Sequence, residues 1–379
     1  MPGPHPAVAR TRRAVADACA DLPDGALVLV ACSGGTDSLA LAAATAFAVR
    51  DHGPSTLRAG AVVIDHGMQP DSAVVAERAA EQCRALGLDP VRVRRVLVAG
   101  AGGPEAAARQ ARYAALAAAA EELGAATVLL GHTRDDQAEG VLLGLARGSG
   151  ARSLSGMAVI RDRWRRPLLD LPRTDTAAAC DAQGLDPWHD PTNTPAADDH
   201  DAPLRSRVRH RVLPVLEAEL GPGVSAALAR TAASLREDAD ALDVWAESVA
   251  GAAMSAGARP VTAPADQGPG VNPTVAAEVS RVPTELLVEI APLLPVPPAV
   301  RRRVLRLASL RAGVPAAALT RTHLLAVEAL LTDWHGQGPI PLPGRVVVFR
   351  GCGRLALRAG ATHTAAEHDV QHQQGEPQR

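Results

Sequence analysis

The first 150 residues alternate between short aliphatic runs and longer helix-like segments, and this alternation constrains the fold more than any other feature. The strand-like runs are Ala26–Cys32, Ala59–Asp65, Val91–Val98 and Ala126–Gly131. The helix-like segments between them are Asp37–Val49, Asp71–Leu86 and Pro104–Leu123. Strands that alternate with helices form βαβ units, so we predict an α/β fold with a parallel sheet covered by helices on both faces. The loops after the strands should converge on one ligand site at the carboxyl edge of the sheet.

The chain after residue 220 has a different pattern. Its helix-like segments are Val224–Gly257, Thr284–Leu294, Pro298–Ala312 and Thr320–Leu331, and a Gly/Pro-rich linker follows the first of them. Two strand-like pieces, RVVVFR and RLALRA, come near the end. We therefore predict a first domain over residues 1–220, a helical domain over 221–335, a short β tail over 336–362 and a disordered end over 363–379.

Composition narrows the class of protein. The formal net charge is −2, which predicts no strong nonspecific affinity for nucleic acid, although local basic patches remain compatible with it. The five cysteines form no C-x-x-C pair, which argues against a zinc knuckle or a redox dithiol and fits a reducing compartment. We find neither a signal peptide nor a run of about 18 strongly apolar residues, so we predict a soluble cytoplasmic protein with no membrane contact.

The hexapeptide SGGTDS, residues 33–38, lies between a buried strand and a helix. Glycines at such a turn let backbone N–H groups form a nest for an anion, and the following helix adds its positive end. The loop matches neither G-x-x-x-x-G-K-[ST] nor G-x-G-x-x-G. A carboxylate in a phosphate loop, here Asp37, is repulsive unless a cation bridges the charges, so we predict Mg²⁺ at Asp37. The alternative is an ordinary turn capped by Ser33, Thr36 or Ser38.

A second polar cluster, GHTRDDQAE, follows the fourth strand-like run. His132, Asp136 and Glu139 recur at helical spacing, so these three side chains can share one face of a helix. The alternative interpretation is local: Thr133 caps the helix, and acidic residues in its first turn complement the helix dipole.

Two groups of arginines are candidates for binding phosphate. Arg109 and Arg112 lie three residues apart on one predicted helix and can both face the crevice. Arg205, Arg207 and Arg209 alternate in RSRVRHR, a pattern that suits contact with an RNA backbone. Either group could instead form a solvated face paired with nearby acids.

These motifs resemble a known family. SGGTDS resembles the PP-loop, S-G-G-x-D-S, of the ATP pyrophosphatase superfamily. Three further stretches resemble the tRNA(Ile)-lysidine synthetase family in order and wording: VVIDHGMQPDS, PEAAARQARYAAL and LLGHTRDDQAEGVLLGLARGSGARSLSGM. RPLLDLPR and GLDPWHDPTN extend the resemblance, which covers residues 25–215. It implies a Rossmann-like PP-loop domain followed by a helical domain that binds tRNA.

The resemblance also implies a reaction. ATP and Mg²⁺ adenylate the C2 oxygen of the wobble cytidine of tRNA(Ile) with a CAU anticodon, and an amine of L-lysine then displaces AMP to give lysidine. A pyrimidine carbonyl oxygen is a poor leaving group, so it needs this activation, and the attacking amine must be neutral. A homodimer is compatible with the family.

Roles for individual residues follow from the resemblance. The PP-loop residues would hold ATP, with Asp37 and Asp136 as ligands of Mg²⁺. Asp65 and His66 would lie beside the adenosine, and Arg109 would contact tRNA together with the RSRVRHR arginines. The residues implied for ATP binding are Ser33, Gly34, Gly35, Thr36, Asp37, Ser38, Asp65 and His66; those implied for catalysis are Asp37, Arg112, His132 and Asp136; those implied for tRNA binding are Arg109, Arg205, Arg207 and Arg209.

The sequence departs from the family pattern after DPTN. Ser206 stands where asparagine is usual, and extra acidic residues are inserted over 195–203, which weakens the inference of particular RNA contacts there. Three other functions remain open: a tRNA 2-thiolation enzyme with the same loop, an amide-forming PP-loop synthetase and an ATP-sensing module. The dispersed cysteines disfavour a thiolation enzyme that carries an iron–sulfur cluster.

Overall fold

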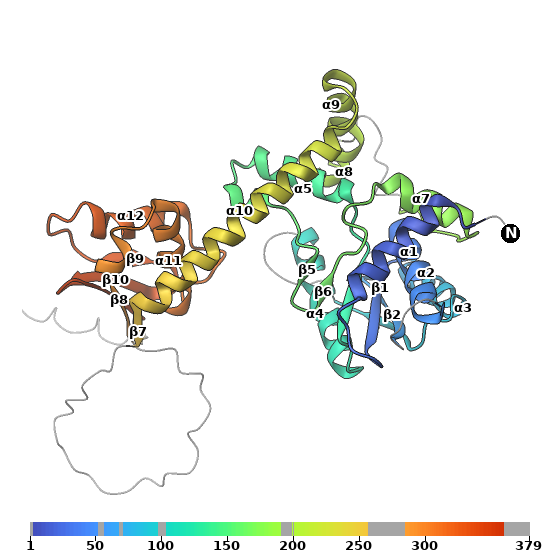
Figure 1. Cartoon of the computed structure of the whole chain (residues 1–379), viewed down its shortest axis with the longest axis horizontal. Coiled ribbons are helices and arrows are strands. Elements are labelled where there is room, and N and C mark those ends of the chain that lie inside the picture. Colours follow the sequence, from blue (N-terminus) through green and yellow to red (C-terminus); the bar gives the residue numbers. More distant parts are fainter. Residues whose placement is uncertain are drawn as a thin grey trace, which may run out of the picture. The chain divides into compact units, whose positions relative to one another are not determined.

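The computed structural model describes residues 3–51, 57–67, 71–97, 104–190, 199, 201–256 and 285–359. The chain divides into two compact units, Met1–Ala239 and Asp240–Arg379, each with a hydrophobic core of its own. Figure 1 shows the elements of each unit.

The first unit is built on a six-stranded sheet in the order β3-β2-β1-β4-β6-β5. Its strands are β1 (Leu27–Cys32), β2 (Arg58–Asp65), β3 (Val91–Arg95), β4 (Thr127–Leu130), β5 (Ile160–Arg161) and β6 (Trp164–Arg165). All neighbouring strands are parallel except β5 and β6. The predicted parallel sheet and its four strands are therefore confirmed. Because β2 and β4 lie on opposite sides of β1, the strand order reverses at β1, which is where α/β sheets open a crevice for ligands.

Helices cover both faces of this sheet, as predicted. They are α1 (Pro6–Cys19), α2 (Thr36–Asp51), α3 (Ser72–Ala85), α4 (Pro104–Glu122), α5 (Arg134–Ala146), α6 (Ala151–Leu154) and α7 (Arg173–Ala182). Val28 and Val30 of β1 face a core formed with α1, α2, α3 and α7, whereas Leu27 and Leu29 face a second core formed with α4. This alternation explains the unbroken aliphatic runs, because a strand buried on both faces needs apolar residues at every position.

A bent helical segment ends the first unit, and its last helix includes the first residues of the second unit. It consists of α8 (Leu204–Arg207), a π-helical turn over Val208–Val212, α9 (Leu213–Leu220) and α10 (Val224–Ala253). Pro214 lies in the first turn of α9 and cannot donate a backbone hydrogen bond, which explains the widened turn before it. No single helix among the described residues is long and apolar enough to cross a membrane; only the bent pair Leu204–Leu220 and Val224–Ala253, taken together, meets the length and composition test.

The second unit contains a five-stranded antiparallel sheet and two longer helices. The strand order is β7-β8-β11-β10-β9. The elements are β7 (Met254–Ala256), β8 (Glu285–Glu289), a 3-10 turn (Ala291–Leu293), α11 (Pro298–Arg311), α12 (Arg321–Thr332), β9 (Ile340–Leu342), a 3-10 turn (Pro343–Arg345), β10 (Val346–Gly351) and β11 (Arg354–Ala359). The helical region and the small C-terminal sheet of the predicted fold class are both present.

Two predicted helical stretches are wrong. The helix predicted over Val224–Gly257 ends at Ala253, and Met254–Ala256 forms β7, which pairs with β8. Thr284–Leu294 was expected to be helical, but Glu285–Glu289 forms β8 and only Ala291–Leu293 is helical. Leu286 and Val288 alternate with half-buried residues, and β8 pairs with both β7 and β11. Long-range pairing thus overrides a local helical pattern. The predicted linker after α10 and the predicted disordered end over 363–379 lie outside the described residues.

Candidate active site at the carboxyl edge of the sheet

The PP-loop connects the end of β1 to the start of α2, as predicted. Gly34 has φ +79°, and a Cβ atom built there would lie 3.0 Å from the Cβ of Ala79 on α3. A side chain at position 34 would therefore strain the turn and press on α3. The carbonyl of Gly34 accepts a hydrogen bond from the backbone N–H of Trp188 at 2.9 Å. Both contacts fix the glycine turn in place beside the sheet.

Hydroxyl groups hold the interior of this loop. The backbone N–H of Ser33 donates to Ser38 Oγ at 3.1 Å, and Ser38 Oγ donates to the carbonyl of Gly35 at 2.8 Å. These bonds are the local capping that the alternative interpretation of the loop requires. Capping is compatible with ligand binding, because these hydrogen bonds shape the loop. Binding of ATP stays a prediction for Ser33, Gly34, Gly35, Thr36 and Ser38.

Asp37 follows directly, in the first turn of α2, and α7 contacts both of its carboxylate oxygens. Thr176 donates to Oδ1, and Arg173 Nε donates to Oδ2 at 3.3 Å. Burial raises the pKa of Asp37 above its ordinary value, although Arg173 and Thr176 oppose the shift. Neither Arg173 nor Thr176 was singled out from the sequence.

The predicted acidic cluster lies at the start of α5, at the end of the neighbouring strand β4. Asp136 Oδ2 accepts the backbone N–H of Thr133 at 2.7 Å, and the two residues form a capping box with Thr133 at the N-cap of α5, which is the position that the alternative interpretation gave it. Its other oxygen, Oδ1, accepts from Arg173 at 2.9 Å. Burial would raise the pKa of Asp136, but Arg173 and the Thr133 N–H outweigh it and lower the pKa, which keeps this carboxylate ionised.

Arg173 joins these two loops. Its guanidinium contacts Asp37 of the PP-loop helix and both Asp136 and Glu139 of α5, the last at 3.4 Å. Its backbone N–H donates to Asp135 at 2.8 Å. One side chain thus brings together carboxylates from the ends of two adjacent strands, which supports a single crevice at the point where the strand order reverses.

A basic group lies around His132. Among the described residues, buried side-chain nitrogens without a hydrogen-bond partner include His132 Nδ1, Arg112 Nε and Arg166 Nε. Burial lowers the pKa of His132 well below its ordinary value; Asp136 opposes the shift, and nearby guanidinium groups, first that of Arg112, add to it. The ring is therefore neutral at pH 7. Unpartnered buried polar atoms are costly, so such a group indicates a place for a polar ligand.

The surroundings of the other predicted residues near this edge differ from one another. Asp65 ends β2 and accepts the backbone N–H of Gly67 at 2.9 Å. Burial lowers the pKa of the neighbouring His66, with a further contribution from Arg112, and within the described part of the chain its buried Nδ1 atom has no hydrogen-bond partner. Arg109 is exposed, and its guanidinium lies 5.0 Å from the ring of Tyr113. The roles predicted for Asp65, His66 and Arg109 stay predictions.

The basic segment RSRVRHR lies on α8 and the π-helical turn. Arg209 Nε donates to Glu139 at 2.7 Å, and Arg205 lies 3.7 Å from the same carboxylate. Glu139 itself is fully buried. Pairing with nearby acids was the alternative to RNA contact predicted for this segment, and these contacts show such pairing. Arg207 also has an interaction within the chain. Binding of tRNA by Arg205, Arg207 and Arg209 remains a prediction, and most of the acidic insertion at 195–203 lies outside the described residues.

The carboxylates fit a magnesium ion that arrives with ATP. In the described part of the chain, no group of three or more His, Cys, Asp or Glu residues is arranged to hold a metal by itself. Mg²⁺ commonly takes one or two carboxylates and completes its coordination with water and phosphate oxygens. Asp37 and Asp136 already face one guanidinium, so a cation between them is compatible with the donor set.

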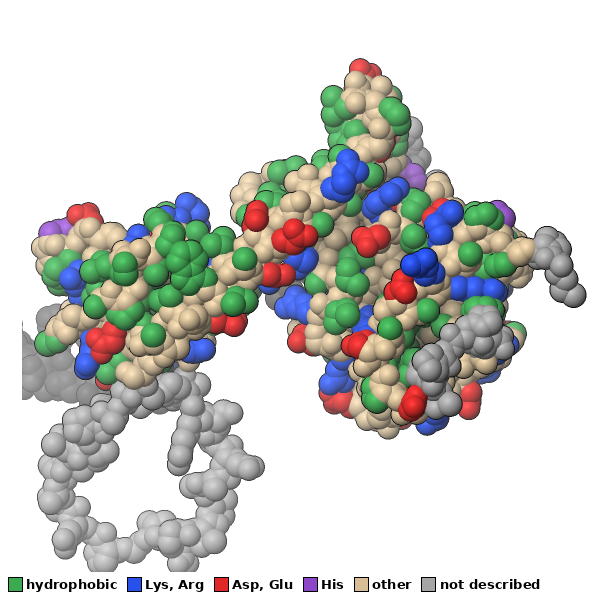
Figure 2. Space-filling model, viewed as in Figure 1, with side chains coloured by type: hydrophobic (Ala, Val, Ile, Leu, Met, Phe, Trp, Pro, Cys, Tyr) green, Lys and Arg blue, Asp and Glu red, His purple; other side chains and the backbone are tan. Residues whose placement is uncertain are grey.

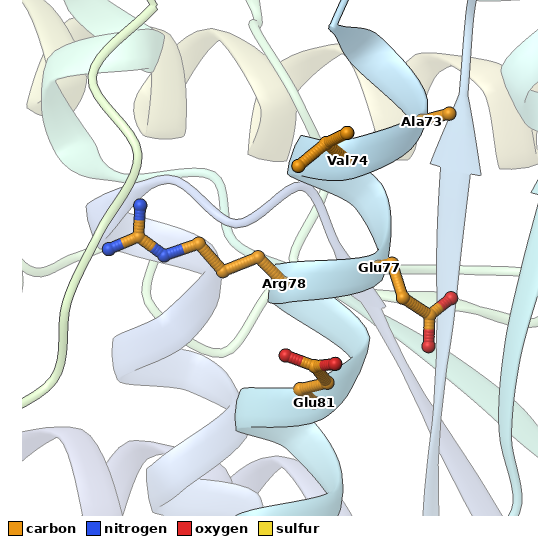
Figure 3. Close-up of a pocket in the computed structure, with 5 residues that line it drawn as sticks. All are labelled: Ala73, Val74, Glu77, Arg78 and Glu81. Carbon is orange, nitrogen blue, oxygen red and sulfur yellow. The ribbon is translucent and has the colours of Figure 1, made fainter.

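An open surface depression is lined by other residues. It has a volume of about 620 Å³ and lies along one side of α3, lined by Ala73, Val74, Glu77, Arg78 and Glu81 (Figure 3). It contains no predicted site residue. Figure 2 shows acidic and basic side chains interspersed over the visible face of the first unit, consistent with the near-neutral net charge.

Comparison with known proteins identifies the family. The PP-loop domain family matches residues 8–216, and the TilS substrate binding domain matches residues 289–355. A tRNA(Ile)-lysidine synthase of Thermobifida fusca is 52% identical over 95% of this chain and 100% of the relative. One of Streptomyces coelicolor is 48% identical over 94% of this chain and 100% of the relative.

A solved structure supports the fold. The U34-tRNA thiolase of Methanococcus maripaludis, solved with its [4Fe-4S] cluster, has a TM-score of 0.50 and 18% identity, and the alignment covers 61% of this chain and 80% of the thiolase. At this identity the likeness shows the fold alone. The chain matches both domain families, and the two relatives are 52% and 48% identical to it over nearly their whole length. The chain therefore belongs to the tRNA(Ile)-lysidine synthase family.

Proposed function

We propose that this protein uses ATP to attach L-lysine to C2 of the wobble cytidine of tRNA(Ile) with a CAU anticodon, giving lysidine, AMP and pyrophosphate. The observation that carries the proposal is the 52% identity, over nearly the whole of both chains, to a protein named tRNA(Ile)-lysidine synthase. The crevice described above supplies groups suited to both steps.

In the first step the C2 oxygen attacks the α-phosphorus of ATP, and the bond to pyrophosphate breaks. The PP-loop backbone from Ser33 to Ser38 would hold the leaving pyrophosphate. Asp37 and Asp136 would hold Mg²⁺, which neutralises charge on the phosphates. Arg112 would stabilise the charge that develops on the α-phosphate, and neutral His132 would orient the cytosine ring.

In the second step an amine of lysine attacks C2, the bond from C2 to the AMP oxygen breaks so that AMP leaves, and the nitrogen passes a proton to water. The amine must reach the site unprotonated or lose a proton there. Asp136 is ionised, which suits it to hold the ammonium form and to place the amine against C2. Adjacent Glu139 is tied to Arg173 and Arg209, which suits it to a positioning role.

The two units have different roles in this proposal. The first unit contains the PP-loop and the acidic cluster, and the second contains the region that matches the TilS substrate binding domain. We infer that the second unit binds the tRNA body, that the protein acts in the cytoplasm, and that a homodimer is compatible with this activity.

The products of ATP cleavage test the proposal. Purified protein with ATP, Mg²⁺, lysine and tRNA(Ile) should form AMP and pyrophosphate, and only in the presence of the tRNA. A thiolation enzyme would also make AMP but would incorporate sulfur and ignore lysine. An amide synthetase would turn over without RNA. AMP formation that depends on tRNA but leaves lysine out of the RNA would contradict the assignment.

A further inference from the structure

Arg173 occupies the position between the two carboxylates that fit Mg²⁺. Its Nε atom lies 3.3 Å from Asp37 Oδ2, and its terminal nitrogen lies 2.9 Å from Asp136 Oδ1. The contact with Asp37 is the longer of the two. A guanidinium and a Mg²⁺ ion cannot both sit between these oxygens, because like charges at such a distance repel strongly.

When no ligand is bound, Arg173 neutralises the negative charge of the carboxylates around it. Asp37, Asp135, Asp136 and Glu139 all contact Arg173 through its side chain or backbone. Arg209 and Arg205 also face these acids, but their ion pairs reach only Asp136 and Glu139. Among the ion pairs of the described residues, Arg173 supplies the cation for Asp37. Among the described residues, the other side chain that donates to this carboxylate is Thr176.

We propose that Arg173 is a positioning residue that stands in for the metal: it holds Asp37 and Asp136 together in the ligand-free protein and withdraws from Asp37 when Mg²⁺ binds. Glu139 is fully buried and remains available as a partner for the displaced guanidinium. This inference rests on the proposed function only in taking Mg²⁺ as the ion that accompanies ATP at this site.

Competition between the guanidinium and the metal gives a measurable consequence. Removing the charge of Arg173 removes the competitor, so a divalent ion should bind more tightly even without ATP or tRNA. We would measure binding of Mn²⁺ alone by the loss of its free-ion EPR signal. We expect Arg173→Gln to bind Mn²⁺ about tenfold more tightly than the wild type. Arg173→Lys keeps one positive charge but has a shorter reach, so its affinity should lie between the two.

Three further measurements separate this role from structural support of α7. Arg10→Gln breaks the bidentate ion pair between α1 and Asp175 on α7 and leaves the acidic cluster untouched, so it should bind Mn²⁺ like the wild type. Adding Asp37→Asn to Arg173→Gln should abolish the gain in affinity, because it removes the ligand that Arg173 had occupied. Millimolar methylguanidinium should weaken Mn²⁺ binding by Arg173→Ala and leave wild-type binding unchanged.

The proposal fails if folded Arg173→Gln binds Mn²⁺ no more tightly than the wild type, or if Arg10→Gln shows the same gain. If Arg173→Gln does not fold, Arg173→Lys decides the matter, and an affinity at or below that of the wild type would overturn the proposal. Incorporation of lysine plays no part in these measurements, so a failure here is distinguishable from a failure of the proposed function.

Discussion

At the scale of single residues, Asp37 is a carboxylate that burial makes costly to ionise. Its raised pKa means that the ionised form destabilises the fold above the ordinary carboxyl pKa, so Asp37→Asn should leave the melting temperature at pH 7 unchanged or higher. The same substitution removes a proposed metal ligand, and AMP formation should fall at least about 100-fold. Asp175→Asn, on the outer contact of α7 with Arg10, is the matched control and should retain activity.

His132 predicts a pH dependence of stability. Its folded-state pKa is lowered, so between the ordinary value of about 6.5 and the folded value the unfolded chain binds a proton that the native chain does not. This term makes the native state less stable as pH falls below about 6.5, by at most about 1.4 kcal/mol per pH unit. Urea unfolding of His132→Gln from pH 7 to pH 5 should lose less stability than the wild type. An identical slope for both proteins would show that His132 titrates normally.

The sequence predicts some of these residues and not others, for a physical reason. SGGTDS and GHTRDDQAE are local motifs, so Asp37 and Asp136 are visible within a few residues of chain. Arg173 and Thr176 reach Asp37 from 136 and 139 residues away, and only the folded sheet brings them together. RPLLDLPR ends on Arg173, but nothing in that motif indicates which carboxylates it contacts.

At the scale of elements, Glu139 connects α5 to α7 and to the π-helical turn. It is fully buried and pairs with Arg173, Arg205 and Arg209. Neutralising it leaves three half-buried guanidinium groups without this buried partner, so Glu139→Gln should lower the free energy of unfolding by about 1–3 kcal/mol. Glu121→Gln, at an exposed pair with Arg163, should change it by less than about 1 kcal/mol. Equal effects of the two substitutions on unfolding in urea would contradict this role of Glu139.

The four parallel strands were predicted from the sequence, whereas β8 was not, because the strength of the local sequence signal differs between them. The four parallel strands are aliphatic on both faces, which is a strong local signal. In β8, the sequence ELLVE fits a helix equally well, and its strand state depends on partners in β7 and β11, the latter 65 residues or more away along the chain. The helix α1 and the short strands β5 and β6 were not predicted from the sequence.

At the scale of the whole molecule, each unit has its own hydrophobic core. The buried core of the second unit runs from Ala246 to Leu357 and shares no residue with the cores around the parallel sheet. A protein ending at Ala239 should therefore fold and keep its affinity for ATP and Mg²⁺. We expect its affinity for tRNA to fall at least about tenfold, because an interface loses much of its binding energy with its main contact surface. Equal tRNA affinities of the truncated and full chains in filter binding would show that the second unit does not bind the tRNA.

The most direct test of the proposed function measures whether lysine is incorporated into tRNA(Ile). Radiolabelled lysine, ATP and Mg²⁺ are incubated with the full chain and a tRNA(Ile) transcript that has a CAU anticodon. We expect that label enters the tRNA, that one AMP forms for each lysine attached, and that a transcript with uridine at the wobble position takes up none. Label that enters the uridine transcript equally well, or AMP that accumulates while the CAU transcript stays unlabelled, would contradict the assignment.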